Sequence, residues 1–366
     1  MNLAVDEKFI RECIDLARTA EGHVSPNPLV GAVVLDKEGN VAGRGFHQKC
    51  GESHAEVCAL YEAGEKALGG TLYVNLEPCS HHGKTPPCTD QVIKSGIKRL
   101  VVGMIDPNPK VAGSGIKKIK EAGIQIASGV LEEDCKRLNE IFIKHITQNK
   151  PFLAVKTAIT IDGKIASRTL SSKWITSERA REEVQRLRNK YDAVLTGSGT
   201  VMADDPSLTC RMKGGRNPVR VVIDSMLKTS PRSRVYIDDG TRVILAVSEP
   251  ANRDKLVKYP DNVEILSCPS GENSKIDLIY LQDALHKKEI YSIMAESGGI
   301  LNGALLKAGL IDKFYFFMAP KIIGDNIAKS FIEGFEINDI NDSIKLEFGS
   351  IKELSPDIMF QGYTLR

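Results

Sequence analysis

The chain has little that would suit a membrane, an oxidising compartment or a nucleic acid. No apolar run approaches the roughly 20 residues of a membrane span, and residues 1–17 lack the continuous apolar stretch of a signal peptide. Lys and Arg number 49 against 47 Asp and Glu, and aromatic residues make up only 6%. Eight cysteines in 366 residues do not suggest a disulfide framework. We therefore expect a cytoplasmic protein that binds neither membrane nor nucleic acid.

What the chain does have is typical of a globular protein with more than one domain. Hydrophobic residues make up 42% of 366 residues, a length that suggests two or three domains. Short apolar runs alternate with helical patterns in both halves, which predicts an α/β fold throughout. Pro151 ends a charged helix that we predict over residues 131–148. We place the boundary there, so that the predicted domains are 1–148 and 149–366.

The first half is predicted to form one sheet with helices on both faces. The expected strands are 29–35, 41–46, 71–76, 100–105 and 124–127, and the expected helices are 6–20, 54–67, 113–122 and 131–148. Ser53 is the expected N-cap of the helix 54–67. Thr85 can cap a further helix that has Pro86 and Pro87 in its first turn.

The second half repeats the alternation of strands and helices without repeating the sequence. The expected strands are 152–157, 193–196, 219–224, 242–247, 263–266, 291–295 and 313–318, and the expected helices are 177–190, 277–288 and 300–308. Thr176 or Ser177 is the expected N-cap of the helix 177–190.

One constellation in the first half carries recognisable chemistry. His54, Cys79 and Cys88 are three soft ligands that can hold one Zn²⁺ per chain and leave a fourth position for water. Glu56 lies two residues after His54, so it cannot point in the same direction from a helix. We predict that Glu56 is the catalytic proton shuttle. Together these residues are what a hydrolytic zinc deaminase needs.

The spacing of the two cysteines is unusual and leaves alternatives open. Eight residues separate Cys79 from Cys88, whereas nucleobase deaminases usually have Pro-Cys-x-x-Cys. The inserted residues include His81, His82 and Lys84, which indicates a substrate with an anionic group. One alternative is a structural zinc site with His81 or His82 as the fourth ligand. Another is a pair of unrelated core cysteines.

Two glycine-rich turns in the second half follow predicted strands. They are residues 196–200 and 298–303, and the second opens a predicted helix whose free N–H groups would suit a pyrophosphate. Neither turn matches Gly-x-Gly-x-x-Gly, and tight turns in α/β proteins use the same residues.

Long motifs run through the whole chain. They are Ser25 to Val33, His54 to Glu56, Leu76 to Cys88, Asp106 to Pro109, Val111 to Gly115, Lys156 to Ala158, Ile161 to Lys164, Ser172 to Thr176, Asp204 to Thr209 and Glu296 to Gly299. With these motifs the chain resembles the bifunctional deaminase/reductase family of riboflavin biosynthesis. The resemblance implies a cytidine-deaminase-like α/β/α sandwich followed by a dihydrofolate-reductase-like α/β domain.

The resemblance also implies two consecutive reactions on small phosphorylated pyrimidines. The first is the zinc-dependent hydrolytic deamination of 2,5-diamino-6-ribosylamino-4(3H)-pyrimidinone 5′-phosphate. The second is the NADPH-dependent reduction of the ribosyl side chain, which gives 5-amino-6-ribitylamino-uracil 5′-phosphate. We also expect a homo-oligomer, whose size the sequence leaves open.

For the deaminase, the resemblance implies a set of substrate-binding residues with amide, imidazole, carboxylate and amine groups. They are Asn27, His47, His81, Lys84, Asp106 and Asn108. Amides suit a pyrimidine edge, and lysine and imidazole suit a phosphate. The alternative for Asn27 and Asn108 is turn chemistry beside prolines, and the alternative for Lys84 is a solvated loop side chain.

For the reductase, the resemblance implies two sets of contacts. Those to NADPH are Ala158, Trp174, Thr200, Asp204, Ser225, Gly298, Gly299, Ile300, Leu301, Asn302, Gly303 and Ala304. Those to the substrate are Ser172, Arg188, Leu208, Arg211 and Glu296. We add Lys156, on the first predicted strand, as a group that holds the substrate or polarises its sugar carbon. Arg188 and Arg211 could grip a phosphate through their planar forks, although Arg188 could instead be an exposed helix arginine and Trp174 a core residue.

One position departs from the family pattern. Leu170 stands where family members often carry glycine, so a positive φ there would strain the turn.

Three other functions remain possible for the chain. They are a deaminase with an inactive reductase-like half, a deaminase that edits tRNA or DNA, and a zinc-binding module without activity. The editing enzyme would require a basic surface and stacking aromatic residues.

Overall fold

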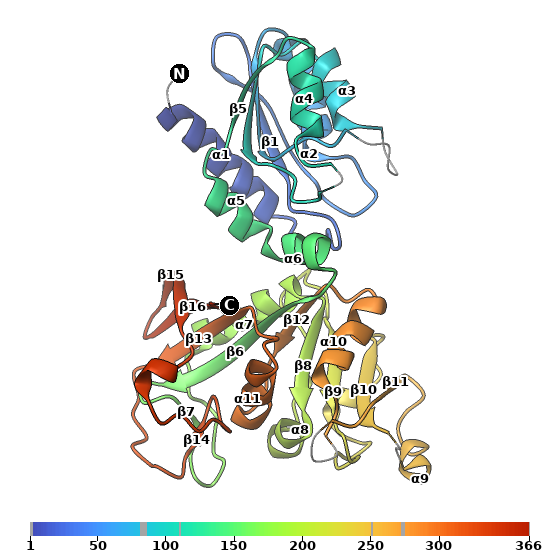
Figure 1. Cartoon of the computed structure of the whole chain (residues 1–366), viewed down its shortest axis with the longest axis vertical. Coiled ribbons are helices and arrows are strands. Elements are labelled where there is room, and N and C mark those ends of the chain that lie inside the picture. The colour runs from blue at the N-terminus through green and yellow to red at the C-terminus, as the bar shows by residue number, and fades with distance from the viewer. Residues whose placement is uncertain (1–2, 81–85, 110, 250–251, 272–274, 366) are drawn as a thin grey trace. The chain divides into compact units, whose positions relative to one another are not determined.

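The computed structural model describes residues 3–80, 86–109, 111–249, 252–271 and 275–365. The chain divides into two compact units, Met1–Asn149 and Lys150–Arg366. Each unit has its own sheet with helices around it, so the predicted α/β class is confirmed (Figure 1). None of the helices in the described parts of the chain combines the length and apolarity that a membrane crossing needs.

The first unit is a five-stranded sheet between two layers of helices (Figure 1). The strand order is β2-β1-β3-β4-β5, with β1 antiparallel to both neighbours and β3, β4 and β5 parallel. The strands are β1 (Gly31–Leu35), β2 (Val41–Phe46), β3 (Thr71–Leu76), β4 (Arg99–Met104) and β5 (Gln125–Ser128). One face is covered by α1 (Leu3–Arg18) and α5 (Glu132–Leu138), and the other by α2 (Ala55–Ala63), α3 (Cys88–Lys94) and α4 (Ser114–Glu121).

Close packing of α2 on the edge strand β2 fixes where that helix begins. A Cβ atom at Gly45 would lie 2.4 Å from the carbonyl oxygen of Ala55 and 2.5 Å from the amide of Ala59. Only a residue without a side chain allows this approach. Because Ala55 is the first residue of α2, the contact also positions His54, which occupies the N-cap.

Three local predictions in the first unit were wrong. His54, not Ser53, is the N-cap of α2, and the helix α3 begins at Cys88, so Pro86 and Pro87 precede it. Thr85 lies outside the described residues. The expected helix 131–148 is two helices, α5 and α6 (Glu140–Gln148), because Asn139 interrupts it: its side chain accepts from Leu29 N (2.8 Å) and donates to Leu29 O (3.0 Å).

The second unit is built on a nine-stranded sheet of order β11-β10-β9-β8-β12-β6-β13-β16-β15. The strands from β11 to β13 are parallel, and β16 and β15 continue the sheet as an antiparallel hairpin. The strands are β6 (Phe152–Thr160), β8 (Ala193–Gly197), β9 (Val219–Ile223), β10 (Val243–Ser248), β11 (Val263–Cys268), β12 (Ser292–Ala295), β13 (Lys313–Ala319), β15 (Leu346–Leu354) and β16 (Asp357–Thr364). A separate ribbon pairs β7 (Lys164–Ala166) with β14 (Lys329–Ser330).

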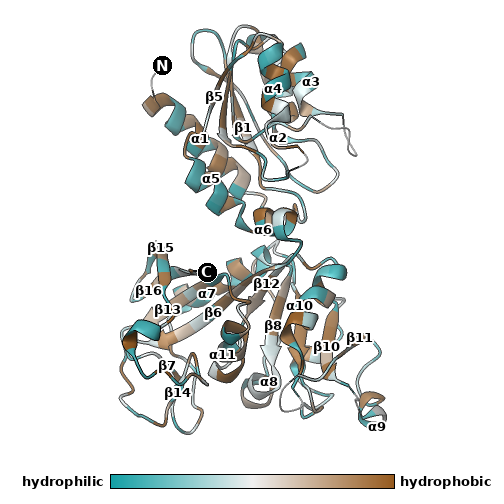
Figure 2. Ribbon diagram, viewed as in Figure 1, coloured by the Kyte–Doolittle hydropathy of each residue, from teal (hydrophilic) through white to brown (hydrophobic). Residues whose placement is uncertain are grey.

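Helices bury apolar side chains against this sheet, whose strands are the most apolar part of the unit in Figure 2. The helices of the unit are α7 (Glu178–Lys190), α8 (Ser198–Asp204), α9 (Arg253–Leu256), α10 (Leu278–Lys287) and α11 (Gly299–Lys307). Leu281 and Leu285 of α10 and Leu305 of α11 belong to the buried cluster that includes the sheet. Ser177 caps α7 by accepting from Ala180 N at 3.3 Å, which confirms one of the two predicted caps.

The hairpin β15–β16, the ribbon β7–β14 and the helices α8 and α9 of the second unit were not predicted. The hairpin β15–β16 was missed because β15 is exposed at most positions on both faces and a bulge between Phe348 and Ile351 breaks its alternation. The helix α8 was missed because its first residues belong to the glycine-rich segment 196–200, whose composition is typical of a turn.

A buried ion pair in the first unit gives a pH-dependent prediction. Arg99 holds Asp6 bidentately (2.8 and 2.7 Å) and Tyr73 Oη donates to Asp6 at 3.1 Å. The hydrogen bond from Arg99 lowers the pKa of Asp6 below its ordinary value of 3.8, although burial opposes the shift. A carboxyl whose folded pKa is depressed stabilises the fold above the unfolded pKa, and this contribution is lost as the pH falls through the folded pKa.

We therefore expect Asp6→Asn to lower the unfolding free energy of this unit by about 2–4 kcal/mol at neutral pH. The difference from wild type should shrink as the pH falls below 3.8. Calorimetric unfolding at neutral and acid pH checks this, with Asp15→Asn as the control because Asp15 is exposed and pairs only locally with Arg18. A penalty that is equal at every pH would contradict the assignment to ionised Asp6.

The departure at Leu170 gives a second prediction. Leu170 has φ 66°, and its side chain is 52% exposed. The turn therefore requires the left-handed conformation that glycine adopts without strain. We expect Leu170→Gly to stabilise the second unit by about 1 kcal/mol. A lower melting temperature for Leu170→Gly than for wild type would show that contacts of the leucine outweigh its strain.

Candidate active sites

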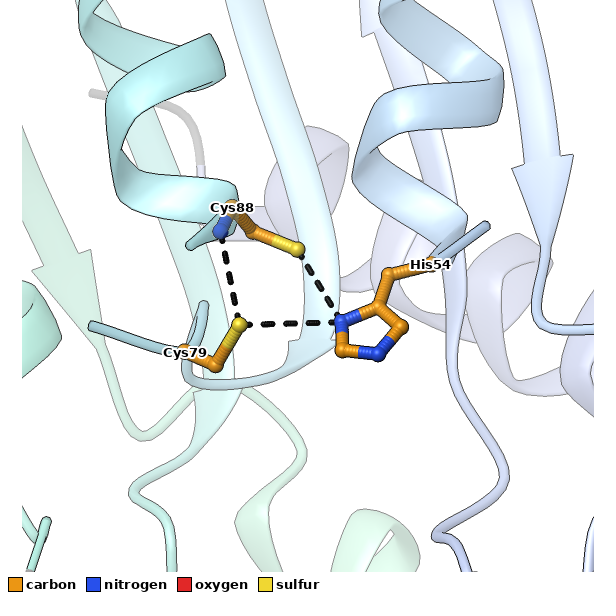
Figure 3. A group of neighbouring side chains, drawn as sticks. All are labelled: His54, Cys79 and Cys88. Carbon is orange, nitrogen blue, oxygen red and sulfur yellow. Dashed lines mark hydrogen bonds between the residues drawn. The ribbon is translucent and has the colours of Figure 1, made fainter. Parts of the chain in front are cut away.

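The three predicted metal ligands converge in the first unit (Figure 3). His54 lies at the N-cap of α2, Cys88 is the first residue of α3, and Cys79 lies in the loop after β3. His54 Nδ1 is 3.1 Å from Cys88 Sγ and 3.6 Å from Cys79 Sγ. The backbone N–H of Cys88 donates to Cys79 Sγ at 3.3 Å. The start of α3 thus supports the sulfur of Cys79.

This donor set fits zinc. Tetrahedral zinc, with bonds of about 2.3 Å to sulfur and about 2.1 Å to nitrogen, separates its ligand atoms by about 3.6–3.8 Å. All three donor atoms already lie within 4.8 Å of one another. Three protein ligands, one imidazole and two thiolates, are the set that a catalytic zinc site with an open position uses.

The charges of the two cysteines are coupled. Hydrogen bonds from Cys88 and His54 lower the pKa of the Cys79 thiol to about 4, although burial opposes the shift. The hydrogen bond to Cys79 and burial raise the pKa of Cys88. The pair therefore holds one proton in common, which a bound dication would displace.

Glu56 is buried in the first turn of α2, with 3% of its surface exposed. Burial raises the pKa of its carboxyl to about 7, and the carboxyl interacts with the thiol of Cys88. A carboxyl beside the metal ligands with a pKa near neutrality can both accept and donate a proton under physiological conditions. This is the property that a proton shuttle needs.

Two of the predicted substrate-binding residues, Asn27 and His47, lie together beside the metal ligands. Asn27 Nδ2 is 3.0 Å from His47 Nε2, and His47 Nδ1 is 3.2 Å from the carbonyl oxygen of Ser53. The two contacts agree if Nδ1 carries the proton and Nε2 accepts from Asn27. The ring centroids of His47 and His54 are 5.4 Å apart. Burial lowers the pKa of His47, which favours the neutral ring. The long-range bond of Asn27 goes beyond local turn chemistry.

Asp106 and Asn108 follow β4, and the remaining two predicted residues are not described. Asn108 N donates to Asp106 Oδ1 at 2.8 Å, so turn chemistry does apply to this pair. His81 and Lys84 lie outside the described residues, as does the alternative fourth ligand His82. The structure adds Glu77, whose buried carboxylate accepts from Asp106 N at 3.1 Å. Glu77 was visible in the sequence only as the residue before Pro78.

In the second unit, Lys156, Arg188 and Glu296 form an ionic cluster, in which Arg188 is buried and the other two are partly buried. Arg188 binds Glu296 bidentately at 2.6 and 3.0 Å and donates to Thr209 O at 2.9 Å. Lys156 Nζ lies 3.7 Å from Glu296 Oε2. Arg188 is therefore not an exposed helix arginine. Its planar fork is engaged by Glu296, so a phosphate could bind it only in competition with that carboxylate.

Burial and the neighbouring charges shift the pKa values of Glu296 and Lys156. Burial by itself would raise the pKa of Glu296, but the charges of Arg188 and Lys156 lower it to about 2. Burial lowers the pKa of Lys156, and Glu296 opposes this shift. A partly buried lysine with a depressed pKa beside a fixed carboxylate is typical of a functional site.

The parallel sheet brings the predicted cofactor residues to one edge. β9, β8, β12 and β6 are neighbours, and the segments that follow the carboxyl ends of the first three carry Ser225, Thr200 and Gly298. Ligands of open α/β sheets bind at this edge. Asp204, at the end of α8, accepts from Ser172 Oγ at 3.2 Å. Ala158 lies on β6, partly buried.

The predicted glycine-rich contacts on α11 divide into two groups. Cβ atoms at Gly299 and Gly303 would lie 2.3 Å from Ser330 O and 1.9 Å from Glu333 O, so both glycines allow the chain to pack against the helix. Asn302 is fully buried and donates to Phe331 O at 2.8 Å. The side-chain positions of these three residues therefore face the protein and not a ligand. Helical periodicity leaves another face of α11 to Ile300 and Ala304, of which Ile300 is exposed. Leu301 is partly buried and packs against the apolar cluster of the unit.

Three further predicted residues have distinct surroundings. Trp174 is 63% exposed, with Arg181 Cζ 4.5 Å from its ring centroid, so the alternative of a core tryptophan is wrong. Leu208 is buried, with φ 54°. Arg211 is exposed and its backbone N–H donates to Gln185 at 2.9 Å.

Comparison with known proteins agrees with both sites. The family model for the cytidine and deoxycytidylate deaminase zinc-binding region matches residues 3–104, and that for the RibD C-terminal domain matches residues 151–360. The riboflavin biosynthesis protein RibD of Bacillus amyloliquefaciens is 41% identical over 97% of this chain and 95% of its own length. That of Escherichia coli is 38% identical over 96% of this chain and 98% of its own length.

Two solved structures are similar over the whole chain. One is a diaminohydroxyphosphoribosylaminopyrimidine deaminase/5-amino-6-(5-phosphoribosylamino)uracil reductase from Thermotoga maritima, with a TM-score of 0.87, 39% identity and 99% coverage of both chains. The other is RibD from Acinetobacter baumannii (form 1), with a TM-score of 0.86, 33% identity and 100% coverage of both chains.

The fold and the two sites define a zinc-dependent deaminase joined to an NADPH-dependent reductase. The chain belongs to the family of the riboflavin biosynthesis protein RibD. It is a bifunctional deaminase and reductase of riboflavin biosynthesis, as its motifs indicated. This membership favours the interpretation with two activities over the deaminase-only, nucleic-acid-editing and non-enzymatic alternatives.

Proposed function

We propose that residues 1–148 deaminate 2,5-diamino-6-ribosylamino-4(3H)-pyrimidinone 5′-phosphate and that residues 149–366 then reduce the ribosyl side chain of the product. The observation that carries the proposal is that one chain brings together two separate groups of candidate catalytic residues. His54, Cys79, Cys88 and Glu56 meet in the first unit, and Lys156 and Glu296 meet in the second. The name of the Thermotoga maritima relative, a diaminohydroxyphosphoribosylaminopyrimidine deaminase and reductase, supports these substrates.

In the deamination, the bound zinc supplies a water molecule of lowered pKa as the nucleophile. Glu56 takes a proton at its carboxylate and delivers it to the departing ammonia. His47, held neutral between Asn27 and Ser53, orients the substrate at the entrance to the metal ligands. Asp106 and Asn108 contact the pyrimidine, and His81 and Lys84 contact its phosphate-bearing side chain.

In the reduction, bound NADPH supplies the hydride. Lys156 Nζ directs its positive charge at the oxygen or nitrogen that gains electron density when the sugar carbon is reduced. Glu296 holds Lys156 in place and is itself held by the bidentate contact with Arg188. Ser172, Leu208 and Arg211 complete the substrate contacts. Trp174, Thr200, Asp204, Ser225 and the start of α11 contact the cofactor.

We also propose a cytoplasmic homo-oligomer. The balanced charge and the absence of a disulfide pattern support the cytoplasmic location. The exposed apolar side chains Phe348 and Ile351 on the edge strand β15 support self-association.

Separate assays of the two half-reactions test the substrates and their order. Ammonia release and NADPH oxidation are measured on the diamino compound and on its deaminated product. We expect ammonia only from the diamino compound, and NADPH oxidation on the deaminated product without ammonia. If zinc-depleted protein oxidised NADPH on the diamino compound at an undiminished rate, the proposed order would be wrong.

A further inference from the structure

The carboxylate of Glu77 lies at the junction between the metal loop and the segment that carries Asp106 and Asn108. Glu77 follows directly after β3 and precedes Pro78 and the ligand Cys79. Its backbone N–H donates to Met104 O, the last residue of β4, at 2.9 Å. The backbone of Glu77 is therefore anchored between the carboxyl ends of two adjacent parallel strands.

Both carboxylate oxygens of Glu77 accept hydrogen bonds from the backbone of the segment that follows β4. Oε2 accepts from Asp106 N at 3.1 Å and from Gly113 N at 2.9 Å. Oε1 accepts from Gly115 N at 2.9 Å and from Ile116 N at 3.1 Å. The residue is 5% exposed, so these bonds are shielded from water. One carboxylate thus binds the backbone at both ends of the segment 106–113.

Two further contacts show that this arrangement is tightly built. The N-cap of α4 is Gly113, which has no side chain that could cap the helix. Gly115 and Ile116 belong to the first turn of that helix. Glu77 therefore caps α4 from a distant part of the chain, where a negative charge is favoured. A Cβ atom at Gly115 would lie 2.1 Å from Pro78 O, and Ser80 Oγ lies 2.6 Å from Ser114 Oγ.

We propose that Glu77 is a positioning residue of the deaminase, which fixes the segment carrying Asp106 and Asn108 relative to the loop carrying Cys79. It touches neither the metal ligands' donor atoms nor the reacting groups in these contacts, so it acts on substrate binding through the backbone. This inference rests on the proposed role of Asp106 and Asn108 in binding the substrate.

The test is Glu77→Gln in the full-length protein. The glutamine amide keeps one acceptor oxygen but places an NH₂ group against two backbone N–H donors. Two of the four hydrogen bonds to the backbone are therefore lost. We expect the KM of deamination to rise by about tenfold while kcat falls by less than about threefold. Zinc content should stay at one per chain, and reduction of the deaminated product should be unchanged. Glu121→Gln, an exposed residue at the end of α4, is the matched control.

A double-variant experiment separates this inference from the assignment of Asn108. If Glu77 acts by positioning Asn108, Glu77→Gln combined with Asn108→Ala should raise KM little more than either change alone. An unchanged KM in Glu77→Gln would overturn the positioning role, and so would loss of zinc, which would mean that Glu77 supports the metal loop instead. An unchanged KM in Asn108→Ala, with a raised KM in Glu77→Gln, would instead reject the assignment of Asn108.

If Glu77→Gln fails to fold, Glu77→Asp provides the same test, because it keeps the charge and shortens the side chain by one methylene. Hydrogen exchange then reports directly on the backbone amides that the carboxylate of Glu77 binds. The amides of Asp106, Gly113, Gly115 and Ile116 should exchange faster than in wild type, with KM raised. Unchanged exchange and unchanged KM would overturn the inference.

Discussion

Glu56→Gln should abolish deamination and leave both zinc binding and reduction intact. The carboxyl is buried beside the metal ligands with a pKa raised to about 7, and glutamine has nearly the same shape but cannot carry a proton between water and ammonia. We expect a loss of about 10³-fold in kcat for deamination. Ammonia release on the diamino pyrimidinone phosphate measures this, and NADPH oxidation on the deaminated product serves as an internal reference.

The control for this variant is Glu65→Gln, which changes an exposed glutamate just after α2. It should leave both activities unchanged. Two results would contradict the role of Glu56. Deamination within tenfold of wild type would mean that another group moves the proton, and loss of zinc would mean that Glu56 is a ligand.

Lys156→Met should have the opposite selectivity, with reduction lost and deamination spared. Methionine retains the length and apolar body of the lysine side chain, and Glu296 remains paired with Arg188. Loss of this partly buried positive charge should lower kcat/KM of the reductase by about 10²-fold. NADPH oxidation on the deaminated product measures the change.

Lys258→Met, which changes an exposed lysine of the same unit, is the matched control.

Since burial depresses the pKa of Lys156, the rate of reduction by the wild-type protein should also fall as the pH rises through that lowered pKa, because the lysine then loses its charge. Equal loss of both activities in Lys156→Met would point to a general disturbance of the protein and not to a role in reduction.

The sequence predicted the elements that alternate regularly and missed those whose pattern is weak. The strands β2 and β3 were predicted to the residue, because turns and apolar runs mark their limits. The hairpin β15–β16 was not, since β15 is exposed on both faces and has no buried side to reveal. Asn139 divides α5 from α6 through its bonds to Leu29, a contact across 110 positions that no local pattern contains.

The same distinction holds for the sites. His54, Cys79 and Cys88 could be predicted because metal ligands must be particular residue types, and the structure brings their donor atoms together. The roles of Arg188 and Asn302 could not, because they depend on partners far along the chain: Glu296 occupies the fork of Arg188, and Phe331 O accepts from Asn302. Glu77 was missed for the same reason, since its partners lie about 30 to 40 positions away.

One chain is predicted to carry out deamination and then reduction. Mass spectrometry of the products after incubation of the purified protein with the diamino pyrimidinone phosphate tests it directly, with and without NADPH. We predict the deaminated ribosyl compound without NADPH and the deaminated, reduced compound with it. Unchanged substrate in both samples, from protein shown to contain zinc, would contradict the account.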